Sequence, residues 1–167
     1  MKIKLSGEIK ESIVDGPGIR YVVFTQGCHH NCKGCHNPET HDFNGGYYKE
    51  IAEIIEDFKK YPYMTGLTLS GGEPFLQKSA ILSLILQFKS LYPKKNIIIY
   101  TGYTFEVLLN DNDDVTNEIL NNIDYLIDGP FILEKRDISL KFKGSTNQRI
   151  IDIKKSLSEN QIIIKEF

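Results

Sequence analysis

The stretch Arg20-Tyr21-Val22-Val23-Phe24-Thr25-Gln26-Gly27-Cys28 decides the fold. Its first six residues are rich in β-branched and aromatic side chains, which is typical of a buried strand. Gly27 ends this strand, and a loop with all three cysteines of the chain follows at once. The sequence therefore predicts a buried strand that carries a cysteine loop at its carboxyl end.

Similar apolar runs recur on the carboxyl side of this strand and alternate with segments of helical spacing. Strands are predicted at residues 66–70, 96–101 and 123–127, with further strands at 149–153 and 161–164. Helices are predicted over residues 47–61, through Leu82, Leu86 and Phe88, after an N-cap at Thr104, and after an N-cap at Thr116.

Continuous apolar strands that alternate with amphipathic helices indicate an α/β fold with a mostly parallel sheet. A closed eight-unit barrel needs about 250 residues, so this chain has room for only about five or six units. We expect an incomplete, laterally open (β/α) barrel formed by a single domain, residues 1–167. Functional side chains should then gather at the carboxyl ends of its strands.

The composition is that of an ordinary globular protein, with a net charge of −2. Such a charge creates no global field for nucleic acid or an anionic membrane, so neither is expected as a partner. The basic pair Lys135-Arg136 is interpreted as part of a solvated face. No signal peptide and no run of about 18 apolar residues is present, which favours a cytoplasmic protein.

The cysteines form a C-x3-C-x2-C motif, Cys28-His29-His30-Asn31-Cys32-Lys33-Gly34-Cys35. Three cysteines this close together do not form a disulfide framework. Three thiolates on one loop can bind three irons of a [4Fe-4S] cluster, and without a fourth cysteine one iron stays open for another ligand. The alternative is structural zinc, with His29, His30, His36 or His41 as the fourth ligand.

A second motif, Ser70-Gly71-Gly72-Glu73-Pro74, follows a predicted strand. Its two glycines leave backbone groups open to the close approach of a ligand, and Glu73 offers a carboxylate to an ammonium group. Taken alone, the segment also fits a plain strand-to-helix turn.

Together these motifs resemble the radical S-adenosylmethionine superfamily, and within it the activating components of anaerobic ribonucleotide reductases. The same resemblance extends to Asp15-Gly16-Pro17-Gly18-Ile19-Arg20, Cys35-His36-Asn37-Pro38-Glu39-Thr40, Asp128-Gly129-Pro130-Phe131 and Gly144-Ser145-Thr146-Asn147-Gln148-Arg149. It covers nearly the whole chain.

The resemblance implies that Cys28, Cys32 and Cys35 are the catalytic centre and ligate a [4Fe-4S] cluster whose fourth iron binds S-adenosylmethionine. It also implies a set of cofactor-binding residues beside these cysteines. They are Gly34, Cys35, His36, Gly71, Gly72, Glu73 and Asp128. Two positions depart from related proteins: Gly34 replaces an aromatic residue, and no lysine stands two residues after Asp128.

The implied activity is cleavage of S-adenosylmethionine to a 5′-deoxyadenosyl radical, which forms a glycyl radical on the large catalytic subunit of anaerobic ribonucleotide reductase. A low-potential electron donor such as flavodoxin is expected as a second partner. Two alternatives stay open: an activase of another glycyl-radical enzyme such as pyruvate formate-lyase, and a non-catalytic zinc or iron–sulfur module.

Four polar residues in the quoted stretches have no settled role. Asp15 and Arg20 would serve partner docking or form an ion pair, whereas Asn147 and Arg149 would contact cofactor or partner or belong to a polar turn.

Overall fold

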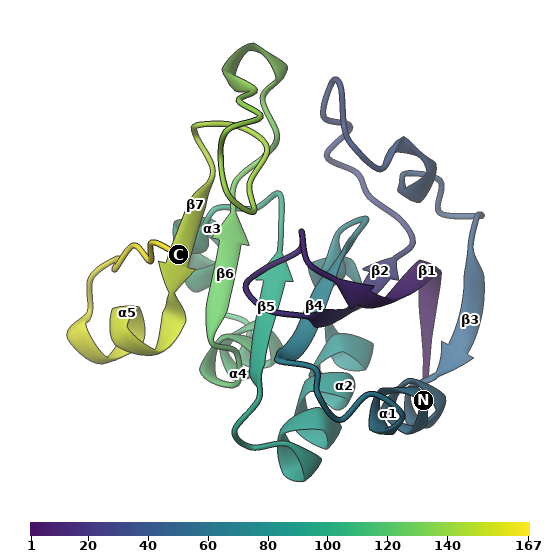
Figure 1. Ribbon diagram of the computed structural model, residues 1–167. Helices are drawn as coiled ribbons and strands as arrows, with labels where there is room; N and C mark the ends of the chain where they lie inside the picture. Colours follow the sequence, from purple (N-terminus) through teal and green to yellow (C-terminus); the bar gives the residue numbers. More distant parts are fainter.

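Seven strands form one open sheet in the computed structural model, which describes residues 1–167 (Figure 1). Their order across the sheet is β3-β1-β2-β4-β5-β6-β7. The strands are β1 (Lys2–Ser12), β2 (Arg20–Thr25), β3 (Tyr47–Glu50), β4 (Gly66–Gly71), β5 (Asn96–Tyr100), β6 (Tyr125–Asp128) and β7 (Arg149–Asp152).

The middle of the sheet is parallel, because β2, β4, β5 and β6 pair side by side in the same direction. Antiparallel strands flank it, with β1 and β3 on one side and β7 on the other. The outermost strands β3 and β7 do not pair with each other, so the sheet stays open. The predicted α/β fold with an open partial barrel is confirmed.

Helices cover one face of this sheet, where α1, α2 and α4 lie together (Figure 1). The α-helices are α1 (Ile51–Lys59), α2 (Lys78–Leu91), α3 (Phe105–Asn110), α4 (Asp114–Asn121) and α5 (Ile153–Glu159). Three short 3-10 helices complete the chain: η1 (Pro38–Thr40), η2 (Pro74–Gln77) and η3 (Leu133–Lys135). No helix combines the length and the apolar character that crossing a bilayer requires.

The main core lies between these helices and the sheet and contains 27 buried apolar residues. In α1 the buried side chains are Ile51, Ile54, Ile55 and Phe58, which confirms the helical spacing seen in the sequence. Burial of a large apolar side chain contributes about 1.5–3 kcal/mol, so this face holds the helices on the sheet.

The strands β2, β4 and β5 lie where the sequence predicts them, and Thr104 is the N-cap of α3. Its side-chain oxygen accepts a hydrogen bond from Val107 N at 3.4 Å. Thr116, however, is not an N-cap, because α4 begins one turn earlier. Asp113 is the residue that caps α4, and its carboxylate accepts from Thr116 N at 3.0 Å.

The predicted helix at residues 47–61 is wrong over its first four residues. Tyr47–Glu50 is strand β3, because it pairs antiparallel with β1, a strand that the sequence analysis did not predict. The helix α1 begins only at Ile51, where a capping box between Glu50 and Glu53 starts it. A long-range partner thus overrides the local helical pattern.

The two predicted strands at the carboxyl end differ in outcome. Residues 149–152 form β7, which runs antiparallel to β6. The predicted strand at 161–164 is not formed, and only one isolated bridge joins Ile164 to Ile151.

Candidate functional site

A cavity of about 530 Å³ lies at the carboxyl ends of the parallel strands. Four successive strand ends contribute to its wall, as expected for an α/β sheet. The lining includes Cys28, Cys32 and Cys35 after β2, Gly71 and Gly72 at the end of β4, Thr101 and Gly102 after β5, and Gly129 after β6.

The cysteine loop between β2 and η1 is folded on itself by backbone hydrogen bonds. Cys35 N donates to Cys32 O at 3.1 Å, and Gly27 N donates to Thr40 O at 2.7 Å. Gly34 has a φ of +75°, a left-handed conformation that glycine adopts without strain. The three cysteines are free and half-buried, so their thiols are available as ligands.

Burial raises the pKa of the Cys28 and Cys35 thiols above the usual value, and neighbouring thiols add to the effect. Without a bound cation these two thiols are therefore protonated at neutral pH. Iron ligation would need to displace their protons. Thiolates are the soft ligands that iron–sulfur clusters use, so the donor set fits such a cluster.

The arrangement does not fit a single metal ion equally well. No three His, Cys, Asp or Glu side chains are grouped so that they could hold one ion. A cube of four irons and four sulfides needs ligands spread over a wider space, and the three cysteines share one cavity.

Three of the four histidines considered as zinc ligands contact another side chain. His30 Nε2 is 2.7 Å from Glu73 Oε2, and His29 Nε2 is 3.1 Å from Tyr103 Oη. The ring of His36 packs on Phe131 with 5.0 Å between ring centres. His41 lines the cavity. The structure thus gives three of the four rings another neighbour.

The glycine turn after β4 packs directly against the cysteine loop. Gly72 N donates to Thr25 O at 2.8 Å, and Glu73 N donates to Gly27 O at 2.9 Å. A Cβ atom on Gly72 would lie 2.3 Å from Gly27 O, so no other residue fits without moving the backbone. The two motifs found in the sequence therefore meet in space.

Glu73 lies beneath the cavity and is completely buried, and it is absent from the cavity wall. Its carboxylate accepts hydrogen bonds from Thr101 Oγ1 at 2.9 Å and from the backbone N of Gly102 at 2.9 Å and of Phe75 at 3.1 Å. His30 provides the fourth contact. Glu73 thereby links the cysteine loop to the ends of β4 and β5, whereas its contact with a cofactor stays a prediction.

Asp128 is also buried, with an exposed fraction of 1%. It accepts from Phe105 N at 2.8 Å and from Arg149 Nε at 3.0 Å. Arg149 also pairs with Glu106, at 2.7 Å from Nη2 to Oε2. Hydrogen bonds with these two carboxylates raise the pKa of Arg149 and stabilise its charge. Arg149 thus belongs to an ion-pair network with Asp128 and Glu106. Gly129, which follows Asp128 in the chain, lines the cavity.

Phe131 is a site residue whose role was not evident from the sequence. It lines the cavity, and a Cβ atom on Gly34 would lie 3.4 Å from its ring. Side chains from another loop, Phe131 and Leu133, therefore lie beside Gly34. In the sequence, only the aromatic character of this residue, directly after Asp128-Gly129-Pro130, could have indicated that it lies in the site.

Arg20 does not serve docking, because its side chain is completely buried. It donates to Thr68 Oγ1 at 2.6 Å, to Asn96 Oδ1 at 2.7 Å and to Leu67 O at 2.8 Å. Burial lowers the pKa of Arg20 to about 10. No ion pair joins it to Asp15, which lines the cavity instead.

Asn147 belongs to the polar loop before β7. Its Nδ2 donates to Pro130 O at 2.8 Å, which ties this loop to the segment after β6. Its Oδ1 is buried and accepts no hydrogen bond. A bound group with a donor at this position would satisfy it.

Comparisons with known proteins agree with this geometry. A protein-family model described as "4Fe-4S single cluster domain" matches residues 14–151. An anaerobic ribonucleoside-triphosphate reductase-activating protein of Vibrio cholerae is 42% identical over 144 residues, covering 83% of this chain and 90% of the relative. The chain belongs to the family of anaerobic ribonucleoside-triphosphate reductase-activating proteins.

Other members of this activating-protein family are similar over the same region. The protein of Enterobacteria phage T4 is 36% identical over 143 residues, covering 82% of this chain and 86% of the relative. That of Escherichia coli K12 is 34% identical over 142 residues, covering 81% and 90%. The family resemblance seen in the sequence is confirmed, and with it the [4Fe-4S] cluster and S-adenosylmethionine as cofactors.

Proposed function

We propose that this protein is the activase of an anaerobic ribonucleoside-triphosphate reductase. The observation that carries the proposal is the meeting of the cysteine loop and the glycine turn at one cavity, in a chain of the activating-protein family. The catalytic subunit of the reductase is then the protein partner. Its radical would be placed on a glycine, whose Cα has no side chain to block approach.

In this proposal Cys28, Cys32 and Cys35 hold the cluster. When bound and reduced, the cluster supplies the electron that cleaves S-adenosylmethionine to methionine and a 5′-deoxyadenosyl radical. Holding the cofactor beside the cluster makes electron transfer an intramolecular event. Gly71 and Gly72 let the backbone approach the methionine part of the cofactor, since neither has a side chain.

The remaining proposed cofactor residues lie in two different places. His36 lines the cavity and packs on Phe131, and Gly34 borders the Phe131 ring. We assign these residues to the adenosine part. Glu73 and Asp128 act beneath the wall, because their carboxylates already accept hydrogen bonds from the protein.

The electron would come from a low-potential donor, for which we propose flavodoxin. A cluster that reduces a sulfonium works near the negative end of the range of about −700 to +450 mV. Free, half-buried thiols of this kind survive in a reducing compartment, so we place the protein in the cytoplasm.

Anaerobic purification with metal analysis tests the first step. We expect about four irons per chain, as in a cubic cluster, and no tightly bound zinc. The Cys32→Ala variant should lose the chromophore and the conversion of S-adenosylmethionine to 5′-deoxyadenosine. Lys33→Ala, a change of an exposed residue in the same loop, is the matched control and should keep both when dithionite supplies the electron. Turnover by the Cys32→Ala variant at the normal rate would refute the proposal.

The partner is tested by mixing the reduced protein with the reductase subunit and S-adenosylmethionine. A glycyl-radical doublet in the electron paramagnetic resonance spectrum is the expected result. A doublet on pyruvate formate-lyase and none on the reductase would assign the protein to a different activase branch.

A further inference from the structure

Three basic side chains beside the cysteine loop have no partner. Lys33, Lys135 and Arg136 are exposed and form neither an ion pair nor a side-chain hydrogen bond. Elsewhere many lysines are neutralised: Lys49 pairs with Asp57 at 2.6 Å, and Lys89 pairs with Asp124 at 2.8 Å. Three positive side chains without an ion pair therefore lie at this place, on a chain whose net charge is −2.

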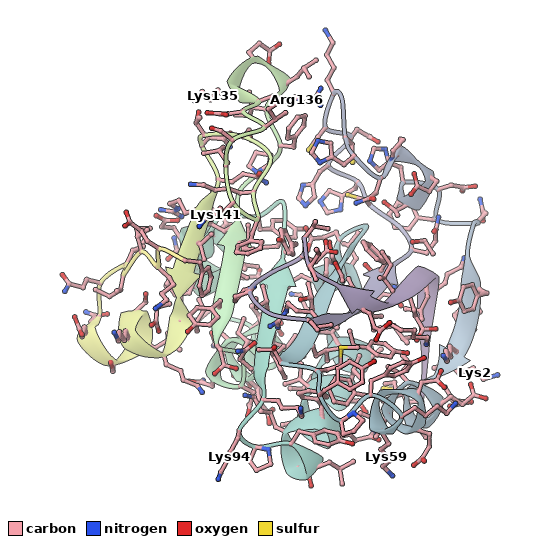
Figure 2. The ribbon with its side chains drawn as sticks, viewed as in Figure 1. Lys2, Lys59, Lys94, Lys135, Arg136 and Lys141 are labelled. Carbon is pink, nitrogen blue, oxygen red and sulfur yellow. The ribbon has the colours of Figure 1, made fainter.

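These cations come from two segments that touch each other. Gly34 follows Lys33, and a Cβ atom on it would lie 2.9 Å from Leu133 Cδ1 at the start of η3. Lys135 ends η3, and Arg136 follows it. Figure 2 shows Lys135 and Arg136 at the outer end of their loop, far from Lys59 and Lys94.

The loop after η3 adds further basic side chains. Residues 133–143 contain four basic and two acidic side chains. One of the acids, Asp137, accepts from Ser139 N at 2.9 Å and from Ser139 Oγ at 2.6 Å. Lys141 is exposed and reaches only the carbonyl of Phe167 at 3.4 Å. We call Lys33, Lys135, Arg136 and Lys141 the basic rim.

We propose that the basic rim is the docking surface for an acidic one-electron donor protein, an inference that rests on the proposed function. Lys33 stands between Cys32 and Cys35 in sequence and is exposed, whereas both cysteines line the cavity. A protein seated on the rim therefore lies beside two cluster ligands without entering the cavity. The cavity stays free for S-adenosylmethionine and for the glycine of the reductase.

The step at the rim is a transfer of one electron. The reduced donor is oxidised by one electron, the cluster is reduced by one, and no bond or proton changes place. Complementary charge mainly raises the rate at which two proteins meet, and salt screens it over about 8 Å at physiological ionic strength. A donor with carboxylates around its redox centre is the partner that this rim fits.

The test is anaerobic stopped-flow reduction of the loaded protein by a reduced flavodoxin of strongly negative net charge. The double variant Lys135→Glu, Arg136→Glu should lower the second-order rate constant at low salt by roughly tenfold or more and flatten its salt dependence. The control, Lys59→Glu with Lys94→Glu, makes the same change of net charge away from the rim (Figure 2) and should react like the wild type.

Reduction by dithionite distinguishes a loss of docking from damage to the site, because this small reductant can reduce the cluster without binding to a protein surface. Both double variants should cleave S-adenosylmethionine with dithionite at the wild-type rate. Failure of that reaction in the wild type would refute the proposed function instead. Equal rate losses in both double variants, or a normal rate with flavodoxin in the rim variant, would overturn the rim proposal. So would a defect confined to glycyl-radical formation on the reductase.

Discussion

Glu73 stabilises the floor of the site through four hydrogen bonds. The Glu73→Ala variant leaves buried donors on Thr101, Gly102 and Phe75 without an acceptor. Since each unsatisfied buried donor costs about 1–3 kcal/mol, we expect a loss of about 3 kcal/mol or more in the free energy of unfolding. Urea denaturation of the cluster-free protein measures this loss.

Two further variants test whether the lost hydrogen bonds cause the destabilisation of Glu73→Ala. Glu39→Ala removes an exposed carboxylate of the cysteine-loop segment, whose side chain makes no hydrogen bond, and should change stability by less than about 0.5 kcal/mol. Glu73→Gln keeps one acceptor oxygen and should recover part of the loss. Similar losses for Glu39→Ala and Glu73→Ala would contradict the proposed role of the Glu73 hydrogen bonds.

At the residue scale, sequence spacing predicted which side chains meet but not what their atoms contact. The three cysteines and Gly71-Gly72 do share one cavity, because all of them follow parallel strands. The carboxylates of Glu73 and Asp128 also follow strands, yet both point to donors inside the protein. Their partners, Thr101 and Arg149, are distant in sequence, so no local pattern could reveal them.

The turn after β4 depends on a residue without a side chain at position 72. Gly72→Ala would place a Cβ atom 2.3 Å from Gly27 O, and this contact is to rigid backbone. Overpacking of this kind costs about 1–3 kcal/mol, so we expect a clear fall in the urea midpoint. Gly7→Ala in β1 is the control, because no atom lies within 4 Å of its Cβ position. Destabilisation by Gly7→Ala to the same extent would contradict the explanation.

The N-cap of α4 should make stability depend on pH. Hydrogen bonds from Thr116 lower the pKa of Asp113 from its usual 3.8 to about 2. A carboxyl with a lowered pKa in the folded state stabilises it above the unfolded pKa, and this contribution is lost as the pH falls toward 2. Asp113→Asn keeps a capping oxygen without the charge. The difference in urea midpoint between wild type and variant should therefore be present at pH 5 and shrink at pH 3. An equal difference at both pH values would contradict a stabilising role for the charge of Asp113.

At the element scale, strands with a continuous apolar run were predictable, whereas strands set by a distant partner were not. β2, β4 and β5 carry buried β-branched and aliphatic residues along their length, and the sequence shows them. β1 mixes exposed and buried positions and has two register shifts against β2, so its alternation is broken. β3 has no buried residue and exists through its pairing with β1.

At the scale of the whole molecule, two long loops far apart in sequence extend from the same end of the sheet (Figure 1). One is the cysteine loop after β2, and the other joins β6 to β7. The two loops pack against each other where Phe131 contacts His36 and Gly34. The three cysteines proposed as cluster ligands, however, all belong to the first loop.

This architecture predicts how loading the cluster propagates. Tying Cys28, Cys32 and Cys35 together restricts the cysteine loop, and the contact with Phe131 and Gly34 should transmit the restriction to residues 129–148. Hydrogen exchange measured by mass spectrometry should therefore slow in both loops on loading, while peptides from α1 and α2 stay unchanged. Phe131→Ala should abolish the effect in the second loop only. Protection of residues 129–148 that persists in Phe131→Ala would show that the coupling runs by another route.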